Sequence, residues 1–160
     1  MTVAQGAGLR PLLRRMAALP VEERVRLLRA LTEGGQRSLV HHWPSWAHDG
    51  QLAPAGDWRV WLIRAGRGFG KTRAGAEWVS ALARATPGGR IALVGATAGD
   101  VARVMVEGES GLIAVAHAGE RYHWSRDQGV FTFASGAKAF VYSAVAPDPP
   151  TFADVRGRGG

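Results

Sequence analysis

Apolar and polar positions alternate with helical spacing in the first part of the chain. Across residues 9–31, leucine, methionine and valine return every three or four positions, which predicts an amphipathic helix. Pro20 is expected to divide this stretch into two helices, because proline lacks an N–H donor and disrupts a helix interior. The pair Gly34-Gly35 is expected to end the helical unit. The pattern therefore predicts a helical N-terminal segment over residues 1–40.

Further along the chain, the pattern changes to short apolar runs separated by glycine-rich or proline-rich turns. Residues 60–63 and 90–95 are mostly apolar, which is typical of strands buried in a parallel sheet. A helix rich in small residues is expected between them, and a cap at Thr97 predicts a second helix to about Val106. Later segments predict a short helix at 112–116, strands at 122–124, 130–133 and 139–142, a hairpin around Ser135-Gly136, and a break at 147–150.

A glycine-rich turn joins the run at residues 60–63 to the helix that follows it. Gly66, Gly68 and Gly70 permit a tight turn and let backbone N–H groups approach an anion. The helix presents its own N-terminal N–H groups and the positive end of its dipole to the same anion. This layout is that of a phosphate-binding loop, although Ala65 stands where the usual first glycine would be. It predicts a bound nucleoside triphosphate, and a glycine turn without a ligand is the less favoured alternative.

Three side chains in this loop carry candidate chemistry. Lys71 can reach the β- and γ-phosphates, and the hydroxyl of Thr72 can hold Mg²⁺. Arg67 lies four residues before Lys71, where a guanidinium can contact the γ-phosphate or stabilise charge that develops during its transfer. A solvated surface arginine is the alternative for Arg67, because the chain is rich in arginine.

The sequence around the loop resembles the ATPase segment of the large terminase subunit. Residues 56–79, with the motif G-R-G-F-G-K-T at their centre, are similar to this DNA-packaging motor of tailed phages and phage-like gene transfer agents. The resemblance extends less sharply over residues 43–157. It implies a Walker A loop with catalytic roles for Arg67 and Lys71, and ATP and Mg²⁺ as cofactors. It also implies double-stranded DNA, a portal protein and a small terminase subunit as partners, in the cytoplasm of a bacterial host that carries a phage or prophage.

Gln51 lies upstream of the loop, ahead of Pro54 and Trp58. It looks like the glutamine with which these motors recognise adenine. A side-chain amide both donates and accepts hydrogen bonds, so it can read the edge of the base. A solvated glutamine in a loop is the alternative.

The acidic residues that such an ATPase needs are missing from the sequence. One aspartate positions Mg²⁺ and an adjacent glutamate polarises the attacking water, at the end of a second strand. No apolar run followed by Asp-Glu occurs in the 160 residues, and Asp100 is better explained as part of a helix cap. In the family, that strand follows a segment that corresponds here to residues 142–157, with longer spacing and an extra Pro-Pro. We therefore expect the front portion of a terminase, truncated or frame-disrupted before Walker B and the nuclease domain, that binds nucleotide without useful hydrolysis.

Composition adds three limits to this interpretation. A chain of 160 residues can bury the core of one domain. It has no cysteine, which excludes a disulfide framework and a Cys-based metal site, and no run of about 18 apolar residues that would predict a membrane span. The net charge of +7 comes almost entirely from arginine, since Lys71 and Lys138 are the only lysines. This charge suits a protein that handles DNA phosphates, and an arginine-rich genome explains it equally well.

The sequence thus predicts an α/β fold: an incomplete P-loop NTPase, with a parallel sheet and flanking helices, preceded by a helical N-terminal segment. Residues 41–160 are expected to form the partial ATPase domain. The predicted function is that of the ATP-binding N-terminal part of a terminase large subunit. One alternative is another P-loop NTPase, such as a helicase or a small-molecule kinase. The other is an inactive terminase remnant that acts only as a binding module.

Overall fold

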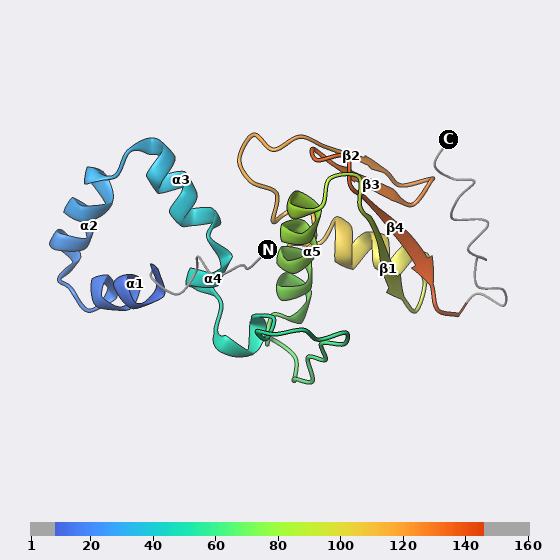
Figure 1. Ribbon diagram of the computed structural model, residues 1–160, viewed down its shortest axis with the longest axis horizontal. Coiled ribbons are helices and arrows are strands. Elements are labelled where there is room, and N and C mark those ends of the chain that lie inside the picture. Colours follow the sequence, from blue (N-terminus) through green and yellow to red (C-terminus); the bar gives the residue numbers. More distant parts are fainter. Residues whose placement is uncertain (1–8, 146–160) are drawn as a thin grey trace. The chain divides into compact units, whose positions relative to one another are not determined.

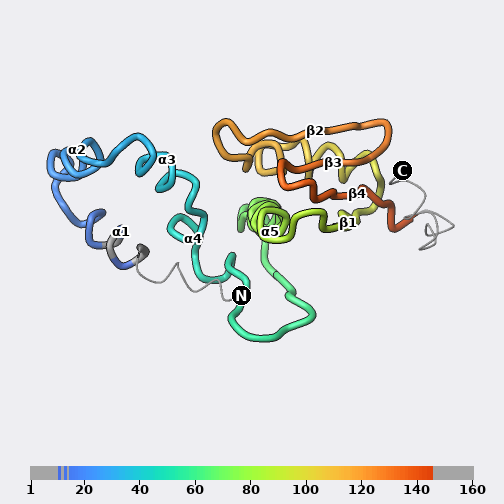
Figure 2. The backbone as a smooth tube through the Cα atoms, turned by 45° about the horizontal axis from the view of Figure 1, so that its top comes forward, coloured from blue at the N-terminus to red at the C-terminus, as the bar shows by residue number. Residues whose placement is uncertain are grey.

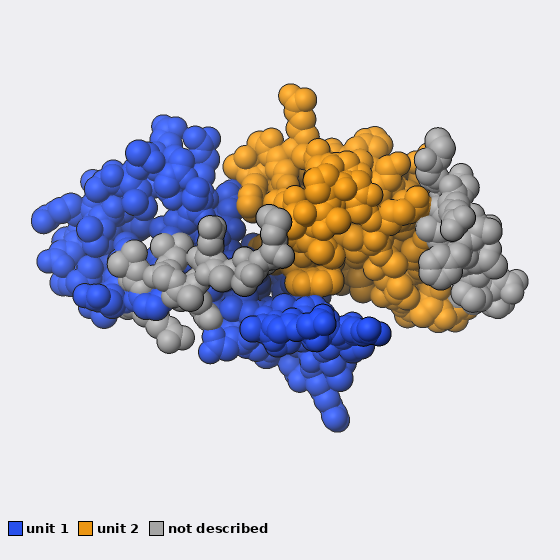
Figure 3. Space-filling model, in the orientation of Figure 1, with its two compact units in different colours: residues 1–74 blue, residues 75–160 orange. Residues whose placement is uncertain are grey.

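The computed structural model describes residues 9–145, within a chain that forms two compact units, residues 1–74 and 75–160 (Figure 3). Unit 1 contains short helices and a long irregular segment, and unit 2 contains a four-stranded sheet with helices. The chain is therefore a mixed α/β protein, as the sequence indicates. The predicted domain limits at residues 40 and 41 stay a prediction.

The first helices of unit 1 follow the apolar spacing of the sequence. Helix α1 spans Leu9–Ala17 and helix α2 spans Val21–Ala30 (Figure 1). Pro20 lies immediately before α2, and Glu22 and Glu23 are in its first turn, where carboxylates interact favourably with the helix dipole. The predicted break at Pro20 is confirmed.

The prediction that Gly34-Gly35 ends the helical unit is wrong. Helix α3 spans Glu33–His41 and runs through both glycines. Thr32 caps it, and its hydroxyl accepts a hydrogen bond from the N–H of Gly35 at 3.1 Å. The amide of Gln36 donates to two carbonyls at the end of α2, at 3.0 and 3.3 Å. A cap is worth about 1 kcal/mol, which offsets much of the cost of a glycine in a helix.

The irregular segment that follows contains two short helical elements. Helix α4 spans Trp43–Trp46, and the 3-10 helix η1 spans Asp49–Gln51. The indole of Trp58 donates to the carbonyl of Pro54 at 2.9 Å and shapes the turn beyond η1. A local hydrogen bond between a side chain and a backbone carbonyl is not visible in a pattern of apolar spacing.

Residues 60–63 do not form the predicted buried strand. They lie in irregular structure, with Val60 83% and Leu62 80% exposed and Trp61 and Ile63 half-buried. Within residues 9–145 the sheet has edge strands at Arg90–Gly95 and Tyr122–Ser125, so residues 60–63 are not part of it and have no strand partner there. An apolar run becomes a buried strand only where neighbouring backbone supplies hydrogen bonds and side chains cover both faces.

Unit 2 begins with most of helix α5, which spans Lys71–Ala85, and continues into the sheet. The strand order is β1-β4-β3-β2, with β1 and β4 parallel and the other two pairs antiparallel (Figure 2). The strands predicted at 90–95, 122–124, 130–133 and 139–142 and the hairpin around Ser135-Gly136 are confirmed. The prediction of a parallel sheet is wrong for the described residues, because β3 runs antiparallel to both of its neighbours. The remaining elements are β1 Arg90–Gly95, α6 Ala98–Asp100, the π-helical turn η2 Val101–Val106, β2 Tyr122–Ser125, β3 Val130–Phe133 and β4 Lys138–Ser143.

The core of unit 2 lies against one face of this sheet. The strand register places Leu93, Phe131 and Ala139 on the same face, and η2 packs against β1 and β4. Within the described residues β1 is an edge strand, so Leu93 is its one buried residue, although the sequence predicted a fully buried strand. Residues 112–116 form turns and not the predicted helix. The buried cluster comprises Ala76, Val79, Ala83, Leu93, Val101, Val106, Leu112, Val115, Phe131, Phe133, Ala137 and Ala139.

A bidentate ion pair ties α5 to the segment before β2. The guanidinium of Arg84 donates to both carboxylate oxygens of Glu120, at 2.9 and 2.6 Å. One of these oxygens also accepts from the N–H of His117 at 2.9 Å. The hydrogen bonds from Arg84 hold the pKa of Glu120 below its usual value of 4.5, against the opposing effect of partial burial.

Replacing Glu120 by glutamine should lower the free energy of unfolding by roughly 1–2 kcal/mol at neutral pH, since hydrogen bonds to a charged group are worth about that much in partly exposed positions. The pKa is lowered in the folded chain, so the stabilisation is present above the unfolded pKa and is lost as pH falls through the folded pKa. Denaturant titrations should therefore separate wild type from Glu120→Gln at about pH 7 and bring them together as the pH falls through the lowered folded pKa of Glu120. A difference that does not depend on pH would contradict this role.

Candidate functional site

The glycine-rich loop at residues 65–70 leads from the preceding irregular segment into the first turn of α5. Gly68 has a φ of 78° and Gly70 a φ of 85°, a region of backbone conformation that favours glycine. No residue other than glycine has a positive φ within residues 9–145, so Ala65 has an ordinary backbone conformation. The departure from the usual motif at Ala65 therefore introduces no backbone strain.

Lys71 folds back across the loop. Its ammonium donates to the carbonyl of Ala65 at 2.8 Å and to the carbonyl of Gly66 at 2.7 Å. An ammonium has three donors, so one remains for an incoming anion. The side chain is exposed, and its charge can therefore be reached from solvent.

The start of α5 supplies a second anion-binding feature. The carbonyl of Gly70 accepts the first helical hydrogen bond, from the N–H of Ala74 at 2.9 Å. The N–H groups of the first turn have no acceptor within the helix, and the helix dipole makes this end positive. Thr72 is the second residue of this 15-residue helix and is half-buried. The loop thus places Lys71, Thr72 and the helix terminus in one short stretch of chain.

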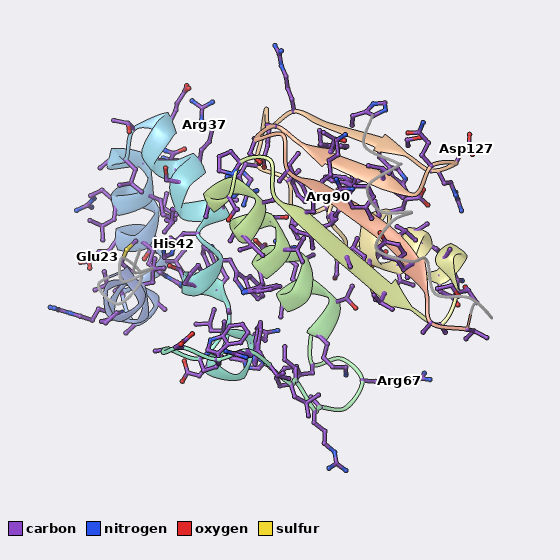
Figure 4. All side chains as sticks on the ribbon, turned by 45° about the vertical axis from the view of Figure 1, so that its right-hand side comes forward. Glu23, Arg37, His42, Arg67, Arg90 and Asp127 are labelled. Carbon is purple, nitrogen blue, oxygen red and sulfur yellow. The ribbon has the colours of Figure 1, made fainter. Side chains whose placement is uncertain are left out.

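Arg67 lies at the turn of the loop. Its side chain is exposed and extends away from the loop (Figure 4). Within residues 9–145, no carboxylate forms an ion pair with Arg67. The hydrogen bonds that Lys71 makes within the loop do not involve Arg67, whose side chain stays exposed at the turn.

Gln51 contacts the loop directly. Its Nε2 donates to the carbonyl of Phe69 at 2.8 Å, and its Oε1 accepts from the N–H of His48 at 3.1 Å. The rings of His48 and Phe69 meet edge to face, with centroids 4.5 Å apart. Gln51 is therefore brought together with the loop through the loop's own backbone, and its predicted role in recognising adenine stays a prediction.

Sequence reasoning missed the parts played by His48, Phe69 and Arg73. Phe69 occupies a variable position of the loop motif, and His48 has no chemical partner nearby in the sequence. The guanidinium of Arg73 lies 5.6 Å from the ring centre of Trp43, a cation–π contact that ties α5 to α4. The spacing of three residues between His48 and Gln51, which is that of a capping box, was the one available signal.

The acidic residues near the helix starts have structural partners. The hydroxyl of Thr97 accepts from the N–H of Asp100 at 3.0 Å and donates to its carboxylate at 2.8 Å, and Arg103 donates to the same carboxylate at 2.6 Å. These hydrogen bonds, that from Thr97 first, lower the pKa of Asp100. The predicted cap at Thr97 is confirmed.

Glu77 is buried on α5, with 7% of its surface exposed. Residues 9–145 contain no group of three His, Cys, Asp or Glu side chains that could hold a metal ion.

Two predictions concern residues from Pro147 on, which lie outside the described residues. They are the proline-rich break at 147–150 and the Pro-Asp and Arg-Gly pairs that follow Tyr142 in the family pattern.

The described chain is an α/β protein in which a glycine loop leads into the N-terminus of a long helix. The family described as "Terminase large subunit, T4likevirus-type, N-terminal" matches residues 62–159, which is more than half of the chain and includes the whole glycine loop. The chain belongs to this family and is an N-terminal portion of a terminase large subunit. Neither the curated proteins nor the solved structures contain a match to it.

Membership of this family gives the chain a role in DNA packaging by a terminase, with DNA and packaging proteins of a phage as its general partners. Among residues 9–145, no helix is both long enough and apolar enough to cross a membrane.

Proposed function

We propose that residues 66–72 bind ATP and Mg²⁺, as the Walker A loop of a P-loop NTPase that packages DNA. The single observation that carries this proposal is the position of Lys71. Its ammonium is held at 2.8 and 2.7 Å from two loop carbonyls, directly beside the N-terminus of α5, with one donor left for a phosphate.

Each side chain of the site then has a proposed role. Lys71 contacts the β- and γ-phosphates, and the hydroxyl of Thr72 binds Mg²⁺. The N–H groups of Gly66, Gly68 and Gly70 and of the first turn of α5 contact phosphate oxygens. Arg67 acts on the γ-phosphoryl group during its transfer. The exposure of Arg67 and the absence of a carboxylate partner among residues 9–145 support this last role.

In the assembled motor, ATP hydrolysis would drive double-stranded DNA into a phage-like capsid. The acids that hold the metal and orient water would come from outside residues 9–145. The partners proposed for this motor are a portal protein and a small terminase subunit, in the cytoplasm of the bacterial host. The particle would be a phage, a prophage-derived capsid or a gene transfer agent.

The 160-residue chain should bind ATP in the presence of Mg²⁺ without turning it over. Titration of the chain with a fluorescent ATP analogue should give a saturable signal that unlabelled ATP removes and that weakens when EDTA chelates Mg²⁺, because the metal neutralises phosphate charge. Phosphate release should be no faster than that of a Lys71→Ala variant. An unsaturable signal would contradict nucleotide binding, and release that depends on Lys71 would show that a carboxylate such as Glu77 or Asp100 is catalytic.

A further inference from the structure

We infer that Gln51 is a positioning residue for the phosphate loop, and that its loss weakens binding of any triphosphate whatever base is attached. This inference rests on the proposed function of residues 66–72. It differs from the sequence interpretation of Gln51, in which the amide reads adenine. The two roles differ in how the effect of losing Gln51 on affinity should depend on the nucleobase of the ligand.

The first support is the pair of hydrogen bonds through Gln51, which we name the Gln51 bridge. Nε2 donates to the carbonyl of Phe69 at 2.8 Å, and Oε1 accepts from the N–H of His48 at 3.1 Å. A carbonyl needs a donor and an N–H needs an acceptor, so both partners require the same orientation of the amide. The bridge thus connects the start of η1 to the loop across 18 residues of sequence.

The second support is the close packing on both sides of the bridge. A Cβ added to Gly70 would lie 2.4 Å from Nε2 of Gln51, and one added to Gly50 would lie 3.1 Å from the ring of Phe69. The rings of His48 and Phe69 also pack edge to face beside the bridge. A glycine is therefore required at position 70 for two reasons. Its φ of 85° favours glycine, and the absence of a Cβ lets the amide of Gln51 approach the backbone.

The position of the bridge connects it to phosphate binding. The Phe69 carbonyl belongs to the peptide that leads into Gly70, and the carbonyl of Gly70 accepts the first hydrogen bond of α5. Holding this peptide sets the direction of the N–H groups that begin α5 and of the adjacent Lys71. The N–H groups and Lys71 both make the proposed contacts with phosphate, and neither contacts the nucleobase. A bridge that acts on them must affect ATP, GTP and tripolyphosphate alike.

The test compares Gln51→Glu with wild type in titrations with ATP, GTP and inorganic tripolyphosphate, each with Mg²⁺. The substitution preserves size, removes the donor to Phe69 and places an oxygen against its carbonyl. A hydrogen bond contributes about 1 kcal/mol net, so all three ligands should bind about fivefold more weakly, by the same factor. Gln51→Ala, which adds no charge, should show the same pattern. The matched control is Gln36→Glu, because the Gln36 amide also donates to a backbone carbonyl of unit 1, at 3.0 Å, and should leave all three affinities unchanged.

Hydrogen exchange of the nucleotide-free chain provides a readout that does not depend on ligands. The amide of Ala74, which donates the first hydrogen bond of α5, should exchange faster in Gln51→Glu than in wild type or Gln36→Glu. Unchanged exchange together with unchanged affinities would overturn the inference, and so would a loss confined to ATP, which would restore the adenine-reading role. If wild type binds none of the three ligands while Gln51→Glu accelerates exchange, the proposed nucleotide site fails and the bridge stands.

Discussion

Replacing Lys71 by alanine should weaken binding of ATP with Mg²⁺ by roughly 10- to 100-fold. The ammonium is already held beside the start of α5 by the carbonyls of Ala65 and Gly66. A phosphate that binds there gains a charge-assisted hydrogen bond without ordering a free side chain. Such bonds contribute about 1.5–3 kcal/mol, and each 1.4 kcal/mol is about tenfold in affinity. Titration of wild type and variant with a fluorescent ATP analogue measures the ratio.

The chain offers a matched control, because Lys138 is its only other lysine. Lys138 begins β4 in unit 2, so Lys138→Ala removes an equal charge from a residue that is not part of the loop. ATP affinity should be almost unchanged in this variant. Equal affinity of wild type and Lys71→Ala for ATP would contradict the proposal that residues 66–72 bind ATP. Equal losses of affinity in Lys71→Ala and Lys138→Ala would indicate non-specific attraction of phosphate to a basic protein.

The elements that the sequence predicted well are those whose signals are local. Helices α1 and α2 follow from apolar spacing over a few turns and from the effect of Pro20 on the backbone. The hairpin of β3 and β4 follows from Ser135-Gly136, where Gly136 has a φ of 80° and donates to the carbonyl of Phe133 at 2.9 Å. In each case the residues that decide the conformation lie within the element or beside it.

The elements predicted wrongly depend on contacts outside the segment. Helix α3 continues through Gly34-Gly35 because Thr32 caps it and Gln36 joins it to α2. Residues 60–63 have the composition of a buried strand, but burial also requires a neighbouring strand, which residues 9–145 do not provide. The pattern of apolar residues reports what a segment can bury, and not whether a partner is present.

The candidate site was predictable as far as its motif extends. The glycines, Lys71 and Thr72 follow from the chemistry of binding phosphate with backbone N–H groups, an ammonium and a hydroxyl. The Gln51 bridge was not predictable, because its acceptor is the backbone carbonyl of Phe69, 18 residues away. Backbone acceptors are the same at every residue, so no side-chain pattern marks which one a glutamine will contact.

Replacing Arg67 by alanine should lower ATP turnover by about 10³-fold in a terminase large subunit that carries this segment together with its catalytic acids. Affinity for ATP should change much less. Arg67 is exposed at the turn of the loop and points away from it, so it contributes little to the loop's conformation (Figure 4). An interaction made mainly in the transition state lowers kcat and kcat/KM together and leaves ground-state binding almost intact. Steady-state phosphate release and an independent ATP titration separate these quantities.

Arg64→Ala is the control for this experiment, because Arg64 is also exposed and lies three residues before Arg67. It removes an equal charge from the segment that enters the loop, and turnover should stay near that of wild type. Unchanged turnover in Arg67→Ala would make Arg67 a solvated surface residue. A parallel loss of affinity and turnover would instead mean that its guanidinium binds the ground-state triphosphate, since uniform binding does not distinguish the transition state from the substrate.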